Sequence, residues 1–457
     1  MTKKVVIIGG GAAGPKTAAK LRRENPDYII DIYTQENVIS YSACGLPYFV
    51  EGVIDDHKKL IVRTPEQFGA KGIKVHLLQE CIGINPNSKE VTIKDLNNDH
   101  TYEVSYDVLV LATGARPYIP QIENVNLKNV YTLRTIEDGI KIKEKVQPGK
   151  TVTIVGGGYI AIELLEAFVK NSLTVNIIDI NKHIMGIFDD DISELIQNHI
   201  IRRNGDLVNI FNQDTAVKFE GDSEGFIKKV HTAKGLALDS DFVVIAAGVV
   251  PCSELADTIG ITKGIKNTIR VNSHFMTNVN SIYAVGDCAE KRHSITHKPC
   301  WIPLGSTANK EGRCAALNIS GLNCDFEGVL GSAVTRYFSF TISMTGVTER
   351  EAKELGYSVE TITVTKKDRA GYMPEVANIT IKLIVDKNSR EILGAQAIGC
   401  GEANQRINTV SSAILMNTKI DDFLNLDLPY APPYSPAIDP LLNAAQIIYD
   451  KLENHNR

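Results

Sequence analysis

Cysteine is scarce in this chain, with eight among 457 residues and no Cys-x-x-Cys pair. This pattern excludes a disulfide scaffold, a zinc ribbon and a thioredoxin-like dithiol, and we expect no metal site. No apolar run reaches the roughly 18 residues that a membrane helix requires, and the first residues lack the features of a secretory signal. We therefore expect a cytoplasmic protein in which any reactive cysteine acts alone.

An excess of positive charge is absent as well. The formal net charge is −5, which gives no general attraction for nucleic acid, so any anion must be bound locally. Hydrophobic residues make up 43% of the chain and charged residues 23%, a composition typical of folded globular domains. At this length two or three such domains are expected, without a nucleic-acid or membrane partner.

Short β-branched runs alternate with amphipathic stretches, which predicts βαβ units and parallel sheets. A strand at 4–8, a glycine-rich turn and a helix from about 15 to 23 make the first unit. A second copy begins with a strand at 151–155 and includes a helix through Glu163 and a strand at 174–178.

Two further buried strands, 107–114 and 241–248, are interpreted as chain crossings between these units. Beyond about residue 321, strands at 334–343 and 378–385 and a helix near 404–416 predict a third domain of α+β type.

The first glycine loop fits G-x-G-x-x-G between strand and helix, where backbone N–H groups can approach a pyrophosphate. The acidic residue that usually binds the ribose is replaced by Thr34, and Glu36 is the candidate substitute. The alternative is a tight turn without a ligand. The predicted dinucleotide ligands here are Gly9, Gly11, Ala12, Ala13, Gly14, Thr34 and Glu36.

The second loop has an alanine at the third glycine position, which the pattern tolerates. Asp179 closes the next strand, and a carboxylate there accepts from a ribose 2′-hydroxyl and repels a 2′-phosphate, which favours NADH over NADPH. Lys182 and His183 lie close enough to weaken this preference, and a solvated strand end is the alternative for Asp179. The predicted ligands of this loop are Gly156, Gly158, Tyr159, Ile160, Glu163 and Asp179.

Residues 40–48, Ser-Tyr-Ser-Ala-Cys-Gly-Leu-Pro-Tyr, place Cys44 just before a predicted helix. A helix N-terminus favours a thiolate over a thiol, although composition alone also allows a buried structural cysteine. A serine four residues before Cys-Gly, just after the first βαβ unit, resembles the single-cysteine branch of the pyridine nucleotide disulfide oxidoreductases. That branch includes coenzyme A disulfide reductases, NADH oxidases, NADH peroxidases and NADH-dependent persulfide or polysulfide reductases.

The resemblance extends over nearly the whole chain and implies a bound FAD that receives hydride from a nicotinamide. Residues 277–287 resemble the second FAD motif, which implies that Asp287 holds the ribityl chain. The helix that begins near 303–309 would direct its positive end at the flavin. The resemblance also implies FAD contacts from Ser42, Thr113, Gly114 and Ala308.

The expected fold is therefore α/β, with two Rossmann-like dinucleotide-binding domains, for FAD and NAD(P)H, and a C-terminal α+β dimerisation domain. The expected boundaries are 1–114 and 241–322 for the split FAD domain, 115–240 for the NAD(P)H domain and 323–457 for the dimerisation domain.

The oxidases and peroxidases of this branch carry a histidine inside the first glycine loop, where this chain has Ala12. The missing proton-handling group counts against oxygen or peroxide as the main acceptor. Residues 425–435 instead resemble the Tyr-Ala-Pro-Pro stretch of coenzyme A disulfide and polysulfide reductases. This implies a homodimer in which Tyr430 and Tyr372 reach Cys44 of the partner subunit and supply a proton. Packing tyrosines are the alternative.

Lys16, Lys20 and Arg23 recur at helical spacing, which predicts one positive face for phosphate groups, although exposed lysines are common on helices. By resemblance Arg23, Ser40 and Asn309 would contact coenzyme A, with Lys20 beside them. We expect a reductase of coenzyme A disulfide or a coenzyme A persulfide or polysulfide, acting through Cys44 with NADH as the donor and NADPH as the alternative donor. The alternatives are an NADH oxidase and an electron-transfer flavoprotein with a protein acceptor.

Overall fold

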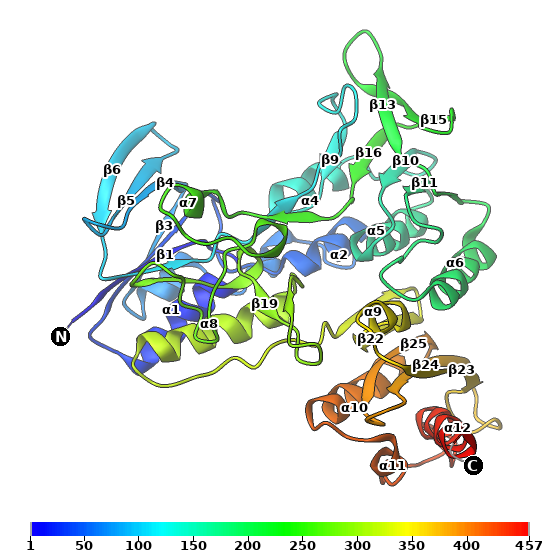
Figure 1. Ribbon diagram of the computed structural model, residues 1–457. Coiled ribbons are helices and arrows are strands. Elements are labelled where there is room, and N and C mark those ends of the chain that lie inside the picture. The colour runs from blue at the N-terminus through cyan, green and yellow to red at the C-terminus, as the bar shows by residue number, and fades with distance from the viewer. Residues whose placement is uncertain (1, 456–457) are drawn as a thin grey trace.

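The computed structural model describes residues 2–455, which form two parallel sheets and one antiparallel sheet with helices around them (Figure 1). The first sheet has the order β18-β7-β1-β2-β3, with all neighbours parallel. The strand order reverses at β1, and ligands of such sheets bind beyond this point. Its strands are β1 (Lys4–Ile8), β2 (Ile29–Thr34), β3 (Ile73–Leu77), β7 (Val108–Leu111) and β18 (Ile282–Ala284), and its principal helices are α1 (Ala13–Glu24) and α8 (Gly305–Ile319).

The second sheet repeats this plan in the order β12-β11-β10-β16-β9, again fully parallel. Its strands are β9 (Val130–Thr132), β10 (Thr151–Val155), β11 (Thr174–Asp179), β12 (Val208–Asn212) and β16 (Phe242–Ile245). The helices of this unit are α4 (Ile136–Lys143), α5 (Tyr159–Lys170) and α6 (Asp190–Asn204).

The boundary expected at residue 240 is too early, because β16 pairs with β10 inside the second sheet. The chain leaves this unit only afterwards, along β17 (Val249–Pro251). This strand pairs antiparallel with β8 (Ala115–Pro117), so the outgoing and returning crossings run side by side.

The third sheet is antiparallel, in the order β21-β22-β25-β24-β23. The single strand expected at 334–343 is wrong, because it is a hairpin that turns at Phe338, whose φ is 54°. The strands are β21 (Ala333–Tyr337), β22 (Phe340–Gly346), β23 (Val359–Lys367), β24 (Asn378–Asp386) and β25 (Ile392–Cys400). The helices of this domain are α9 (Glu349–Glu354), α10 (Ala403–Leu415), α11 (Ile420–Phe423) and α12 (Pro440–His455).

Smaller elements complete the two dinucleotide-type units. Each unit carries a small three-stranded antiparallel sheet. In the first unit its strands are β4 (Gln79–Asn85), β5 (Glu90–Asp95) and β6 (His100–Ser105). In the second unit they are β13 (Ala216–Gly221), β14 (Ile227–Thr232) and β15 (Ala237–Asp239). The remaining helices and strands are α2 (Leu46–Glu51), α3 (Pro65–Gly69), α7 (Glu254–Asp257), β19 (Lys291–Arg292) and β20 (Pro299–Cys300). Across residues 2–455, every helix is too short or too polar to cross a bilayer.

Helix α2 belongs to the first unit but packs against α4 and α5 of the second. Leu46, Phe49 and Val50 are buried in one apolar cluster with the core of the second sheet. Gly139 of α4 allows this approach, since a Cβ there would lie 3.1 Å from Leu46. The segment around residue 44 is therefore fixed between the two units.

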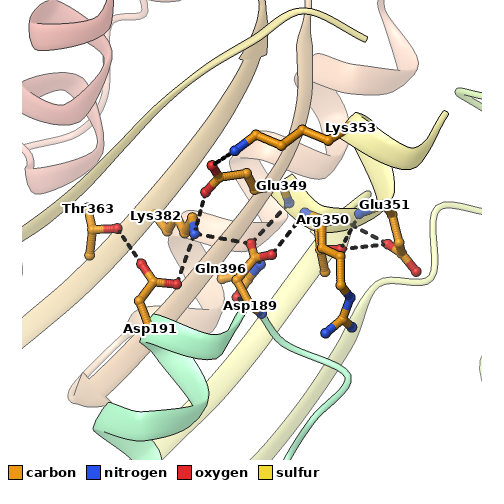
Figure 2. A network of polar contacts seen from close by, with 10 residues as sticks. Asp189, Asp191, Glu349, Arg350, Glu351, Lys353, Thr363, Lys382 and Gln396 are labelled. Atoms are coloured by element: carbon orange, nitrogen blue, oxygen red, sulfur yellow. Dashed lines mark hydrogen bonds and ion pairs between the residues drawn. The ribbon is translucent and has the colours of Figure 1, made fainter. Parts of the chain in front are cut away.

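A buried network joins the second unit to the antiparallel sheet (Figure 2). Lys382 on β24 is 5% exposed and lies 3.3 Å from Asp189, 2.9 Å from Asp191 and 2.7 Å from Glu349. Asp189 also accepts from the backbone N–H groups at the start of α9 and from Gln396. One ammonium group therefore neutralises carboxylates that come from both domains.

Replacing Lys382 should destabilise the protein, because a buried ion pair that loses one partner leaves uncompensated charge. For Lys382→Met we expect the free energy of unfolding to fall by roughly 2–4 kcal/mol. This is less than the loss expected when a fully buried ion pair loses one partner, because Asp191 is half exposed. Calorimetry would measure the effect against Lys366→Met, an exposed lysine of the same sheet. Equal unfolding temperatures for the two variants would contradict the role given to Lys382.

Candidate active site

The first glycine loop lies between β1 and α1, and close backbone contacts require its glycines. Gly9 has a φ of 123°, and a Cβ there would lie 2.0 Å from the carbonyl oxygen of Ala112. At Gly14 a Cβ would lie 2.1 Å from the carbonyl oxygen of Gly9. A Cβ at Gly11 would meet no atom within 4 Å, and Ala12 is exposed. The loop thus presents an open start of α1, where N–H groups can bind a pyrophosphate.

Thr34 ends β2 and is buried, so this strand carries no acidic residue at its end. Glu36 lies two residues further on, and its Oε2 atom is buried without a hydrogen-bond partner. Burial raises the pKa of Glu36, while the Tyr41 hydroxyl and the charge of Arg134 lower it. An unpartnered carboxylate oxygen at this position fits a donor such as a ribose hydroxyl.

Asp287 lies in a tight turn directly after β18. Gly286 has a φ of 82°, and a Cβ there would lie 3.0 Å from the side chain of Ala13 at the start of α1. Trp301 Nε1 donates to the Asp287 carbonyl oxygen over 2.8 Å. The Oδ1 atom of Asp287 is buried without a partner, and desolvation raises the pKa of this carboxyl group. The buried Ala308 of α8 lies on the same side.

A fully buried ion pair holds this turn in place. Glu311 of α8 accepts from Gly286 N over 2.6 Å, and Lys291 donates to Gly286 O over 2.9 Å. The two side chains are 0% exposed and lie 3.2 Å apart. Burial raises the pKa of Glu311 to about 7, against the lowering effects of Lys291 and the Gly286 N–H. Both charges act on the turn that presents Asp287.

Cys44 lies in a single turn, Ala43–Gly45, two residues before α2 begins at Leu46. The segment is tied to the first loop, because Ser40 N donates to Gly10 O over 2.8 Å. Cys44 is exposed to solvent. Desolvation by the surrounding protein nevertheless raises the pKa of the Cys44 thiol, and the charges of Glu163 and Asp287 raise it further.

The expectation that the helix start favours the thiolate of Cys44 is outweighed in the chain by itself: a backbone hydrogen bond at Cys44 lowers the pKa, but desolvation and two carboxylates raise it more. Helix α2 has only six residues, and two carboxylates oppose it. They come from the two different units: Glu163 from α5 and Asp287 from the turn after β18. The thiol of Cys44 is thus affected by charged groups from both dinucleotide-type units.

Arg134 is a site residue that the motifs did not indicate. It lies between β9 and α4, and its charge lowers the pKa values of Glu36, Cys44 and Asp287. Its Nε donates to the Ala115 carbonyl oxygen over 2.9 Å, which orients the guanidinium. No local pattern marks this residue, because only the tertiary fold brings it to the three acidic groups.

The second loop has the same construction between β10 and α5. Gly156 has a φ of 111°, and a Cβ there would lie 2.4 Å from the Ala246 carbonyl oxygen. Gly158 faces open space and Ile160 is half-buried. Asp179 is 6% exposed at the end of β11 and accepts from Asn181 N over 2.7 Å.

Tyr159 and Glu163 lie on the first turns of α5. The Tyr159 hydroxyl is buried without a hydrogen-bond partner, and desolvation raises the pKa of this phenol. Glu163 accepts from Thr335 Oγ1 of β21 over 3.0 Å, while burial raises the pKa of its carboxyl group. The start of α5 thus faces both the Cys44 segment and the third domain.

Helices α1 and α8 lie side by side (Figure 1). They run in the same direction, because Gly312 packs on the start of α1, whereas Asn25 at the end of α1 bonds to Ser320 at the end of α8 over 2.6 Å. Lys20 pairs with Glu24, so the expected positive face is partly neutralised, while Arg23 is exposed. Since eight helical residues span about 12 Å, Ala12 and Lys20 are well separated along α1.

The remaining expected site residues fall around this framework. Ser40, with a φ of 53°, lies beside the first loop, and Asn309 is exposed on the first turns of α8. Ser42 is exposed two residues before the cysteine, and Thr113 bonds to the Cys252 carbonyl oxygen. Gly114 O accepts from Cys252 N over 2.9 Å, where the two chain crossings meet.

Tyr372 and Tyr430 lie together on the surface of the third domain. Their side chains are 76% and 52% exposed. Partial desolvation and the hydrogen-bonding Tyr430 hydroxyl raise the pKa of Tyr372. The two residues are 58 positions apart in the sequence, so the fold creates this pair.

The family description "Pyridine nucleotide-disulphide oxidoreductase" matches residues 3–312, and its dimerisation domain matches residues 332–441. The chain therefore belongs to the pyridine nucleotide-disulphide oxidoreductases, a family that depends on FAD and NAD(P)H. The expected fold class and the family resemblance are confirmed.

Among its relatives, an "NAD(P)H coenzyme A polysulfide/persulfide reductase" from Pyrococcus horikoshii is 36% identical over 98% of this chain and 99% of the relative. A "Coenzyme A disulfide reductase" from Staphylococcus haemolyticus is 28% identical over 95% of this chain and 96% of the relative. The solved NAD-dependent persulfide reductase from A. fulgidus is 36% identical, with a TM-score of 0.94 over 98% of this chain and 84% of that one. Enzymes named NADH oxidase are also relatives.

Removing the Glu163 charge should make Cys44 more reactive, because that carboxylate raises the pKa of the thiol. For Glu163→Gln we expect alkylation of Cys44 by iodoacetamide at pH 7 to accelerate about two- to tenfold, since one pKa unit changes the thiolate fraction tenfold. In the parent protein the rate should still be rising at pH 9. Peptide mass spectrometry measures the rate, with the exposed Glu194→Gln as control. A rate unchanged from the parent would contradict the electrostatic assignment.

Proposed function

We propose that this chain is an FAD-dependent NAD(P)H oxidoreductase that reduces coenzyme A disulfide, or a coenzyme A persulfide or polysulfide, through Cys44. The observation that carries the proposal is the position of this cysteine between the two glycine loops, with Asp287 of one unit and Glu163 of the other both acting on its thiol. The names of the relatives support the same substrate class.

The residues present fit both cofactors. The open loop at Gly11 and Ala12 would receive the FAD pyrophosphate, and the unpartnered oxygens of Glu36 and Asp287 would accept from its hydroxyl groups. The loop at Gly158 and the carboxylate of Asp179 would hold NADH. Bound FAD would carry the electrons of the nicotinamide to sulfur at Cys44.

The chain's own chemistry is thiol–disulfide exchange. The Cys44 thiolate attacks one sulfur of the substrate disulfide, forms a mixed disulfide and releases the other half as a thiolate, which takes up a proton. Because the substrate supplies the second sulfur, one cysteine is sufficient. The resting thiol must first lose its proton, since its pKa is raised.

Coenzyme A is a long ligand with phosphate groups, and α1 and α8 offer a long surface. Ser40 and Asn309 lie near the start of the two helices, while Lys20 and Arg23 lie further along α1. Cationic groups there would bind phosphates as the thiol end reaches Cys44. Arg23 is the stronger candidate, because Lys20 already pairs with Glu24.

We propose further that the protein acts as a homodimer in which Tyr372 and Tyr430 face Cys44 of the partner subunit. The two phenols are exposed in the single chain, and one hydroxyl bonds to the other. A phenol in that position can protonate the released thiolate. The matched dimerisation domain supports this arrangement.

An NADH oxidase is the second candidate function, favoured by relatives of that name such as the one from Methanocaldococcus jannaschii, which is 34% identical. Cys44 would then cycle through a sulfenic acid. Ala12 brings no titratable group to the first loop, so the disulfide substrate is preferred.

Substitution of the cysteine separates these functions. In anaerobic assays we expect the parent to oxidise NADH with coenzyme A disulfide or a coenzyme A persulfide and to react poorly with peroxide. For Cys44→Ser we expect the rate of sulfur reduction to fall at least about 1,000-fold, as for removal of a catalytic nucleophile. NADH should still bleach the flavin bound to this variant. Cys400→Ser, a half-buried thiol elsewhere, is the matched control. Sulfur reduction that survives in Cys44→Ser would refute the proposal.

The donor preference tests the second loop. For Asp179→Ala we expect kcat/KM with NADH to fall about 10- to 100-fold, because a hydrogen bond to a charged group contributes about 1.5–3 kcal/mol. The value with NADPH should fall less or rise, since the repulsion of a 2′-phosphate is removed. Asp239→Ala, an exposed aspartate of the same unit, serves as the control. An equal loss with both donors would contradict a ribose contact.

A further inference from the structure

Two cysteines outside the site described above lie against each other. Cys314 is on α8, and Cys324 is in the segment that leads from α8 to β21. The Cys314 thiol lies 2.8 Å from the carbonyl oxygen of Cys324 and within hydrogen-bonding reach of its thiol. The two residues are ten positions apart, so a bond between them would close a short ring.

Side chains on both sides hold this arrangement. Asn318, one turn after Cys314, accepts from Cys324 N over 2.9 Å and donates to Cys324 O over 2.9 Å. Asp325 accepts from Ser273 Oγ over 2.8 Å, which fixes the next residue. The segment is therefore bound back onto α8 at the point where the thiols meet.

We propose that Cys314 and Cys324 form a second redox site, a dithiol that is converted to an intramolecular disulfide by low-molecular-weight disulfides. The Cys324 thiolate attacks a small disulfide RSSR and gives a mixed disulfide and RS⁻. The Cys314 thiolate then attacks the Cys324 sulfur, forms the internal bond and releases the second RS⁻. The two cysteines lose two protons and two electrons in total, and the small disulfide gains both electrons.

Burial sets the order of these steps. Cys324 is partly exposed, whereas Cys314 is 3% exposed, so the small disulfide meets Cys324 first. Burial and the neighbouring Cys324 thiol raise the pKa of Cys314. The internal step is therefore slow at neutral pH and accelerates as the pH rises.

The new bond would tie α8 to the connection that enters the third domain. Helix α8 also carries Glu311, which holds the Asp287 turn. Oxidation of the pair would thus stiffen the link between the candidate flavin turn and the dimerisation domain. This inference goes beyond the proposed function and does not require Cys44 to be reactive.

The test uses full-length Cys44→Ser protein, in which the redox-active thiol of the proposed function is removed. The protein is treated with glutathione disulfide at pH 7 and pH 9, quenched with N-ethylmaleimide and digested with trypsin. Both cysteines fall on one peptide, 314–336, which lies between two arginine cleavage sites. After oxidation we expect this peptide to carry no N-ethylmaleimide and to be two hydrogens lighter than the dithiol peptide. The rate of this conversion should be at least severalfold higher at pH 9 than at pH 7.

Two variants in the same background complete the test. Cys314→Ser should stop at a glutathione adduct on Cys324, whereas Cys400→Ser should behave like its parent. If peptide 314–336 of the folded parent remains doubly alkylated, or stops at a stable glutathione adduct on Cys324, the proposal is overturned. The main measurement uses the natural Cys314 and Cys324, so it stays decisive even if the Cys314→Ser variant folds poorly.

Discussion

The packing of α2 against α4 and α5 is the constraint on which the candidate site depends. Leu46, Phe49 and Val50 place a helix of the first unit in the core of the second, and each such side chain contributes about 1.5–3 kcal/mol when fully buried. Lys170 adds an ion pair to Glu51, 2.6 Å long, at the end of the same helix. This contact holds the Cys44 segment of the first unit against the helix that follows the second glycine loop.

The fixed backbone brings acidic groups together under partial burial. Glu36 and Asp287 each have a buried oxygen without a protein partner, an arrangement that costs free energy unless a donor is supplied. The chain maintains the Asp287 turn with the Lys291–Glu311 pair, which is itself costly to bury. The fold thus loses some stability in order to hold polar groups in place before a ligand binds, which is typical of a binding site.

The local motifs were sufficient to predict the two parallel units. Glycine loops between a strand and a helix have strict backbone requirements, and Gly9, Gly14 and Gly156 meet them. No local signal predicts the hairpin at Phe338, because neither glycine nor proline marks its turn. Local pattern also cannot place the boundary after 240, because strand order assigns β16 to the second sheet.

The electrostatics of the site could not be predicted in the same way. The helix start beside Cys44 is a local feature, whereas Glu163, Asp287 and Arg134 act on the thiol through space. Arg134 and the Tyr372–Tyr430 pair likewise arise from contacts between distant segments. Such terms need the tertiary structure, because charge interactions depend on separation and burial and not on sequence spacing.

The same groups also make the protonation of Cys44 conditional. Desolvation raises the pKa values of Cys44, Glu163 and Asp287 together, so each favours its neutral form, and the charge on either carboxylate disfavours the thiolate. Interacting groups of this kind titrate as a set. A positive charge that enters the site lowers all three pKa values at once, whereas a ligand that donates hydrogen bonds to Asp287 stabilises its ionised form. The thiolate is therefore governed by what the site binds, and α2 contributes its position more than its dipole.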